Sequence, residues 1–507
     1  MDEVSRARIR VFLNDPAARG QQAVPSDPPL DTERAPWGFR VEGQGGPPPH
    51  PRPYEPDTPE FLHWQIASAL ARGRTLWSRL LPKAGTWIPG PVLPSIPVAG
   101  EGLNAFYDRR ALHFFRDVDA KTGALVHSGD SPDVVTHEQG HAILDAIRPD
   151  LWDAPHFEVA AFHEAFGDIA AILAALEEPE IVRAALDETR GSIDQSNLVS
   201  RLAEELAAAI VARYGPGAAL PNALRDAVNP FSYRAPRSLP EEAPADELSR
   251  EPHSFCRVIT GACWNVLVKL YTAEPGSAGN SDDRAPALAR AARALGGLIA
   301  AAAGSAPPGA AFFHRFSVEL RDAAGDDDAA RSAITEALLS RALITRADEL
   351  PRGERPEVRA AMALAGEALP TRLLDALRER LGASREEEIL VRVRRDGSLA
   401  GRRTRDLVLT GAECGPAEGA AVEISDCFTV TVEVSGHVTA SRIETAGPED
   451  EEDAREFVRT LARNGRIAAD GEIDSARLYR EGQSHFVTRE RDGVRRLRRA
   501  WVDGGGP

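Results

Sequence analysis

Residues 133–144 read Asp-Val-Val-Thr-His-Glu-Gln-Gly-His-Ala-Ile-Leu, and the interpretation of the whole chain starts from them. The stretch contains the pattern His-Glu-x-x-His, with His137 and His141 four residues apart. On a helix this spacing puts both imidazoles on one face, where they can bind a single Zn²⁺ at roughly 2.0–2.1 Å. Glu138 then lies beside the metal, where its carboxylate can take a proton from a zinc-bound water whose pKa has fallen to about 7.

The residues around this pattern predict the helix independently. Ser131 supplies an N-cap and Pro132 fits the first helical position. An apolar stripe follows, and Gly140 should cost about 1 kcal/mol relative to alanine, which indicates close packing at that point. The alternative is a chance pentapeptide whose histidines cap or hydrogen-bond. It is disfavoured because only 12 histidines occur in 507 residues.

A third metal ligand is expected downstream. One known arrangement needs Gly and His three and six residues after the second histidine, but Leu144 and Ile147 stand there. The segment 162–173 instead predicts a helix with a stripe of Phe and aliphatic residues. Glu164 and Asp168 share another face of it, one turn apart, so Glu164 can bind the metal and Asp168 can accept a ring N–H of a zinc histidine. The alternative for this pair is an ordinary solvated helix face.

At this point the chain resembles the thermolysin-like metallopeptidases and their fungalysin-like relatives, from about residue 58 to about residue 300. Four stretches carry the resemblance: residues 133–141 (DVVTHEQGH), residues 164–168 (EAFGD), residues 104–107 (NAFY), and residues 223–225 (ALR) followed by His253. Their order and rough spacing agree with that family.

The resemblance implies an α+β fold of the gluzincin type, with a β-containing N-terminal lobe, a helical C-terminal lobe and the active cleft between them. It further implies a zinc endopeptidase. His137, His141 and Glu164 would hold Zn²⁺, and Glu138 would act as the base. His253 would donate a hydrogen bond to the developing oxyanion, with Asp246, Glu247 or Glu251 as its acidic partner.

The resemblance also implies roles in substrate binding. Asn104 and Ala105 would hold the peptide as an added strand, and Arg225 would bind the carbonyl on the leaving-group side. Val134 and Leu224 match the apolar lining of the first primed pocket, so a bulky hydrophobic residue is expected after the scissile bond. Trp152 stands where the family has a tyrosine. Its indole N–H can replace that donor in part, while the alternative is a core or pocket-wall tryptophan.

Composition narrows the classes of partner. The formal net charge of −17 argues against nucleic acid and against an anionic membrane surface. Neither a signal peptide nor a transmembrane stretch is recognisable, so we expect a cytoplasmic protein. Calcium is a further possibility because Asp133 matches a calcium ligand of the family, but the acidic residues at 177–180 are weak partners for it. Nothing indicates the oligomeric state.

The predicted domains are a Pro/Gly-rich and mostly irregular segment 1–57, a β-containing lobe 58–155 with the zinc helix, a helical lobe 156–383, and an accessory α+β domain 384–507. The accessory domain lies outside the resemblance. We expect it to take no part in the chemistry and either to recruit a partner or to cover the cleft. Its basic run 494–499 is interpreted as a solvated strand that balances the acidic helix 448–464.

Two other functions stay open from the sequence. The first is an inactive, peptidase-like binding or regulatory protein, and the second is a zinc hydrolase of small amides or esters. Of the four cysteines, Cys414 and Cys427 are placed to bridge two strands, whereas buried free thiols are the plainer expectation.

Overall fold

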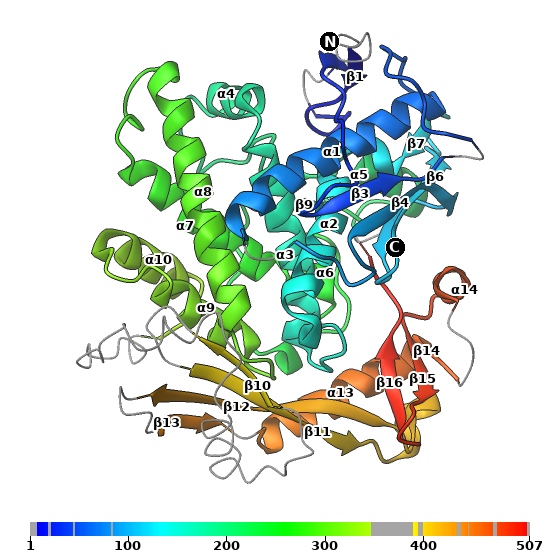
Figure 1. The fold of residues 1–507 in the computed structure, drawn as a ribbon, viewed down its shortest axis with the longest axis vertical. Coiled ribbons are helices and arrows are strands. Elements are labelled where there is room, and N and C mark those ends of the chain that lie inside the picture. The colour runs from blue at the N-terminus through cyan, green and yellow to red at the C-terminus, as the bar shows by residue number, and fades with distance from the viewer. Residues whose placement is uncertain are drawn as a thin grey trace. The chain divides into compact units, whose positions relative to one another are not determined.

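The computed structural model describes most of the chain. It describes residues 8–18, 22–43, 46–82, 85–345, 389–393, 399–432, 438–444, 446–469 and 474–503. The chain forms two compact units. Unit 1 contains residues 1–149, 161–300 and 501–507, and unit 2 contains residues 150–160 and 301–500. The chain combines helices with mixed sheets, so the fold is α+β (Figure 1). The chain crosses from one unit to the other more than once.

The main sheet of unit 1 has six strands in the order β17-β5-β6-β4-β3, with β7 paired to β6. β3 and β6 run parallel to β4, whereas β5 is antiparallel to β6 and β17 is antiparallel to β5. The bounds are β3 Gly38–Val41, β4 Val92–Glu101, β5 Ala105–Tyr107, β6 Leu112–Val118, β7 Leu125–His127 and β17 Val502–Asp503.

Helix α1 (Pro59–Leu80) begins where the sequence predicts it. Thr58 is the N-cap, and its hydroxyl accepts a hydrogen bond from the Phe61 N–H, while Pro59 takes the first position, where no N–H is needed. Its buried aromatic and aliphatic face packs against helix α2 (Pro132–Ile147). Gly73 allows this approach, because a Cβ there would lie 1.7 Å from Oε1 of Gln139 on α2.

Helix α3 (Phe157–Ala175) packs on the other side of α2, and two glycines set the distance. A Cβ on Gly140 would lie 2.8 Å from the Ala170 Cβ, which confirms the close packing expected at that position. A Cβ on Gly167 would lie 2.6–2.8 Å from the ring of His137. The backbones of α2 and α3 thus approach closely beside the first histidine of the motif.

The remaining elements of unit 1 are helices that complete its core and two small antiparallel pairs, β1–β2 and β8–β9. The bounds are β1 Ile9–Val11, β2 Val24–Ser26, α4 Pro179–Glu188, β8 Arg201–Leu202, α5 Glu204–Tyr214, β9 Arg225–Asp226, α6 Pro252–Phe255, α7 Arg257–Ala273 and α8 Ser281–Ser305, the last of which runs across the boundary at residue 300.

Unit 2 is built around a seven-stranded sheet in the order β10-β11-β12-β16-β15-β14, with β13 paired to β12. Helix α13 (Pro448–Arg463) contributes Phe457 and Val458 to a buried core that also contains Phe157 from the segment 150–160. The other bounds are α9 Phe312–Asp322, α10 Asp328–Ser340, β10 Ile389–Val393, β11 Leu399–Val408, β12 Ala421–Val432, β13 Val438–Glu444, β14 Ile467–Ala468, α14 Ser475–Arg480, β15 His485–Arg489 and β16 Arg495–Arg499.

The observed units differ from the predicted domains. Residues 150–160 and 301–345 belong to the unit that contains the C-terminal sheet, and residues 501–507 belong to unit 1. The described part of the segment 14–57 is mostly irregular, as predicted, apart from the short strands β2 and β3, the second of which pairs with β4. Residues 355–382 of the predicted helical lobe lie outside the described residues.

Two further findings bear on the sequence predictions. Within the described residues, α8 is long and apolar enough to span a membrane, but 61% of its apolar window is buried inside the protein, as in a core helix. Cys256, Cys263 and Cys414 are buried free thiols. The side chain of Cys427 lies outside the described part of the chain.

Candidate metal centre

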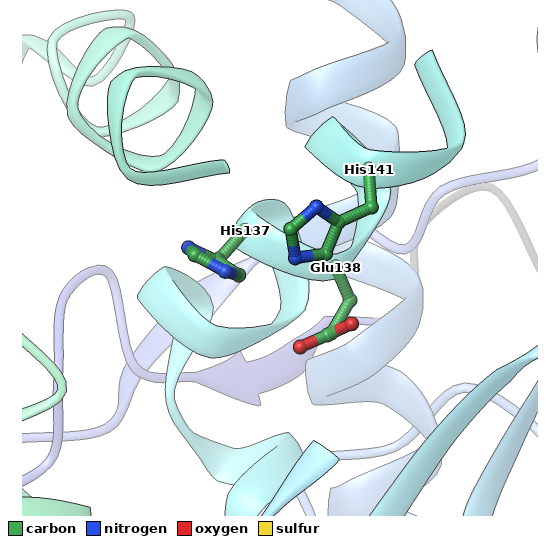
Figure 2. A group of neighbouring side chains, drawn as sticks. All are labelled: His137, Glu138 and His141. Atoms are coloured by element: carbon green, nitrogen blue, oxygen red, sulfur yellow. The ribbon is translucent and has the colours of Figure 1, made fainter. Parts of the chain in front are cut away.

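Helix α2 presents the motif side chains in the predicted way. His137, Glu138 and His141 are gathered on one side of the helix, each offering a ligand atom within 4.8 Å of the others (Figure 2). All three are buried, with at most 3% of their surface exposed. The helix begins at Pro132 after Ser131, as expected, although the Ser131 side chain makes no capping hydrogen bond.

Glu164 comes from α3 and approaches both histidines. Its Oε2 lies 3.4 Å from Nε2 of His137 and 3.8 Å from Nε2 of His141. Two ligand atoms on a tetrahedral Zn²⁺, each about 2.0–2.1 Å from the metal, stand about 3.4 Å apart. Glu164 therefore stands from each histidine at about the separation of two ligands on one tetrahedral ion.

The hydrogen bonding of these atoms also fits a metal. Nε2 of His137 and Nε2 of His141 are buried without a hydrogen-bond partner, and Oε2 of Glu164 faces them with one further close neighbour, Nε2 of His253 at 3.2 Å. Buried polar atoms are rarely left in this state because desolvation without a partner costs free energy. A cation bound between them would satisfy all three at once. Both carboxylate oxygens of Glu138 are likewise buried without a partner, which suits a group kept for a reacting molecule.

Asp168 fixes the orientation of the first histidine. Its Oδ1 lies 3.2 Å from Nδ1 of His137, so the ring can donate there and turn Nε2 toward Glu164. The carboxylate also accepts from Nε of Arg225 at 2.9 and 3.1 Å and from the Thr260 hydroxyl at 3.2 Å. Burial opposes ionisation of Asp168, but the Arg225 charge and the His137 hydrogen bond outweigh it and lower the pKa of Asp168 to about 2.

His253 stands at the short helix α6, whose N-cap is Glu251. Nδ1 of His253 lies 2.6 Å from Oε1 of Glu251, and the other Glu251 oxygen accepts from the Ser254 N–H. Of the three acidic partners considered from the sequence, Glu251 is the one in contact. Burial alone would lower the pKa of His253, but the charges of Glu164 and Glu251 raise it well above the ordinary value, which favours the form with an N–H on both ring nitrogens.

Strand β5 brings the predicted peptide-binding residues to the same unit. Asn104 precedes β5, Ala105 is its first residue, and both are buried. β5 pairs on one side with β6 and on the other with β17, so its outer edge is occupied by the chain's own residues Val502 and Asp503. Asp503 contacts Asn104 and His253, with Asn104 Nδ2 donating to its carboxylate at 3.1 Å.

Glu138 has an acid–base property that depends on the occupant of the site. Burial raises the pKa of Glu138 well above its ordinary value, and Glu164 and Asp503 add to the effect, while His137 and His253 oppose it. A dication beside the carboxylate would favour its ionised form by Coulomb attraction. Glu138 is therefore poised to exchange a proton with a group bound next to it.

Arg225 is placed differently from the prediction. It begins β9, is buried, and forms a two-pronged ion pair with Asp168 at 2.8–3.1 Å. A role of Arg225 in holding a substrate carbonyl stays a prediction. Val134 is buried on α2 and Leu224 is half-buried before β9, which is compatible with an apolar lining but does not test it.

One other prediction needs correction. The indole N–H of Trp152 donates to the Arg499 carbonyl at 3.2 Å within unit 2, so this donor is not kept for an oxyanion. In the acidic segment 177–180, Glu177 pairs with Arg79 and Glu178 pairs with Arg72.

Burial raises the pKa of Asp133 well above its ordinary value, and the nearby charges of Asp15 and Glu204 add to the effect. These two residues are the acidic neighbours that sequence reasoning did not pair with Asp133. A calcium ion at Asp133 stays a prediction.

Sequence reasoning missed two further residues of the site. Thr260 lies one turn into α7, and its hydroxyl donates to Asp168. A threonine in a buried helix is common, so its position in the sequence does not indicate this contact. Asp503 lies 399 residues from its partner Asn104 and was assigned to an appended domain. The only signal was the short apolar run Trp501–Val502, which ends beside it. Comparison with protein-family models and with curated proteins finds no match to this chain.

Proposed function

We propose that this protein is a zinc-dependent endopeptidase of the gluzincin type, with His137, His141 and Glu164 as the metal ligands. The observation that supports this most directly is the position of Glu164 Oε2, which lies 3.4 Å from Nε2 of His137 and 3.8 Å from Nε2 of His141. Both histidine atoms are buried without a hydrogen-bond partner, and the unpartnered carboxylate of Glu138 lies beside them. Structural zinc sites are closed by four protein ligands, whereas three ligands leave a position for chemistry.

When bound, Zn²⁺ would polarise the substrate carbonyl and acidify a water molecule. Glu138 accepts the proton of the attacking water and passes it to the leaving amine. Its burial serves this exchange, because a desolvated carboxylate is a stronger base than one in water. Glu138 does not need to bind the metal to do this.

His253 donates its Nε2–H to the oxygen on which negative charge develops. Glu251 holds the ring through Nδ1, so that Nε2 is directed away from it. Asp168, fixed by Arg225, holds the His137 ring and keeps Nε2 available as a ligand atom. Both supporting carboxylates therefore act through a histidine and not on the substrate.

Strand β5 supports an extended peptide as the substrate over a small amide or ester. Its outer edge is already used for strand pairing by β17, which demonstrates that it accepts an antiparallel backbone. A preference for a hydrophobic residue after the scissile bond follows from the proposed roles of Val134 and Leu224.

The experiment combines metal analysis with cleavage mapping for the wild type and Glu138→Gln. We expect about one zinc per chain in both proteins, because the ligands are unchanged, and turnover reduced by 10³-fold or more in the variant. The wild type and Asp503→Lys are each incubated with a peptide library. The second protein is included because Asp503 contacts His253, and this contact could hide activity in the wild type. Loss of zinc from Glu138→Gln, or turnover within a few-fold of wild type, would show that Glu138 is not the base.

A further inference from the structure

Strand β17 occupies the edge of β5 that the proposed function assigns to the substrate. Val502 pairs with Tyr107 and Asp503 with Phe106 in antiparallel register. Trp501, just before the strand, lies with its ring centroid 5.9 Å from that of Phe106. Val502 is 5% exposed, so the contact is a packed one and not a loose end lying on the surface.

Asp503 reaches the catalytic groups from this strand. Its backbone carbonyl lies 2.9 Å from Nε2 of His253, the nitrogen that we propose donates to the substrate oxyanion. Its carboxylate accepts from Asn104 Nδ2 at 3.1 Å and lies 3.3 Å from the same histidine nitrogen. Asp503 therefore contacts the edge of β5, the side chain of Asn104 and the proposed oxyanion donor His253 at the same time.

The charges explain why this arrangement is stable. Glu251 and Glu164 flank the His253 ring, and Nδ1 is held by Glu251 at 2.6 Å. Nε2 then faces three acceptors: the Asp503 carbonyl at 2.9 Å, Oε2 of Glu164 at 3.2 Å and the Asp503 carboxylate at 3.3 Å. Asp503 supplies two of these three. A lysine at position 503 would place a cation against a ring that is a donor on both sides.

We propose that Trp501–Asp503 is an internal pseudosubstrate, which binds as an added strand and keeps external peptides from β5 and His253. The proposal rests on the proposed function, because the blocked groups are the ones assigned to the substrate there. A tethered segment competes at an effective concentration in the millimolar range, so even weak binding of the strand reduces access for a dilute substrate. The blocking element acts by occupancy and needs no change in the metal ligands.

The test compares full-length wild type with Asp503→Lys, which places a cation against His253, and with Val502→Pro, which removes a strand N–H. Asp492→Lys is the matched control, because Asp492 is an exposed acid in the turn after β15 and makes the same charge change in unit 2. Zinc content, kcat/KM on a peptide with a hydrophobic residue after the scissile bond, and hydrogen exchange of the β5 amides are measured for each.

We expect both strand variants to keep zinc, to lose protection of the β5 amides, and to gain about tenfold or more in kcat/KM, with Asp492→Lys unchanged. A synthetic peptide of residues 498–507 added to Asp503→Lys should restore inhibition. If the β5 amides become exposed and zinc is retained but kcat/KM equals that of wild type, the pseudosubstrate proposal is wrong while the peptidase stands.

The two proposals fail in different ways. If none of the four proteins retains zinc, the proposed metal centre is wrong. If all four retain zinc and none cleaves any peptide, the endopeptidase itself is wrong, and the pseudosubstrate is overturned with it. If β5 stays protected in both variants and kcat/KM stays at the wild-type level, the strand is a permanent part of unit 1 and not a displaceable inhibitor.

Discussion

The α2–α3 site of unit 1 and the strand β16 of unit 2 both gather charged side chains, but they treat them in opposite ways. On β16, Arg496 pairs with Asp406 at 2.8 Å, Asp492 at 2.7 Å and Glu490 at 2.9 Å, and it stays partly exposed. In the α2–α3 site, both carboxylate oxygens of Glu138 and the Nε2 atoms of His137 and His141 are buried and have no hydrogen-bond partner.

The difference separates stability from chemistry. Ion pairs in contact with solvent contribute little to the free energy of unfolding, because solvent screens their charges. Charges that are buried and unsatisfied cost free energy in the folded chain, so they persist where another molecule completes them. The basic run of β16 thus has a structural explanation. Arg496 pairs with an acid of β11 and with acids of the turn before β16, whereas the sequence predicts a balance with the acidic helix α13.

After Glu138→Gln, the largest effect is expected at His253. His253→Ala should lower kcat by about 10²–10³-fold, the usual cost of losing one oxyanion donor, with zinc content unchanged. The measurement is steady-state kinetics in both the wild-type and Asp503→Lys backgrounds, so that release of β17 does not mask the loss. A rise in KM with kcat unaltered would make His253 a substrate-binding residue and would weaken the contrast with β16.

A smaller effect is expected for the carboxylate that orients His137. Asp168→Ala should weaken zinc affinity or activity by roughly 10–100-fold, because the ring loses the acceptor that fixes it. Asp406→Ala, which removes an acid from Arg496, is the matched control and should leave zinc binding unchanged and cost less than about 1 kcal/mol of stability. An equal loss of zinc affinity in the two variants would show that Asp168 supports the metal no more than Asp406 does.

The smallest effect concerns pH and a buried histidine of unit 2. Burial, together with the Arg499 and Arg466 charges, lowers the pKa of His485 well below its ordinary value. Its contribution to stability is therefore complete above about pH 6.5 and is lost as the pH falls, by about 1.4 kcal/mol per pH unit at most. Hydrogen exchange of β15 should show this slope in wild type and a flatter one in His485→Gln.

The control for this pH dependence is His50→Gln, because His50 is an exposed histidine elsewhere in the chain. It should leave the slope of β15 exchange against pH as in wild type. A slope that persists in His485→Gln would assign the acid sensitivity of unit 2 to other groups.

The local parts of the molecule were readable from the sequence. The start of α2 at Pro132, the cap of α1 at Thr58 and the span of α13 follow from capping residues and periodicity, which act within a few residues. The sequence predicts Glu164 and Asp168 as site residues, because they lie one helical turn apart and the metal held by His137 and His141 needs a third ligand. The close approach of Gly167 on α3 to the His137 ring on α2 is a contact between two helices. Spacing along the sequence does not give its distance.

The remaining features depend on contacts between distant segments. Phe157 belongs to the core of unit 2 because of what it packs against, and nothing in its neighbours distinguishes it from the residues of α3 that belong to unit 1. Asp503 is an acid after a short apolar run, a pattern found on many surfaces. Its position at β5 is a property of strand pairing across 399 residues, which no local pattern encodes.

The position of Asp503 along the chain has a consequence in time. Ribosomes add residues from the N-terminus at about 5–20 per second, and domains fold as their residues emerge. His253 precedes Asp503 by 250 residues, so about 12–50 seconds pass between the synthesis of the two partners. During that interval every proposed metal ligand has been made, but the residue that closes the edge of β5 has not. Each newly made chain therefore passes through a stage at which a peptide meets no competing strand.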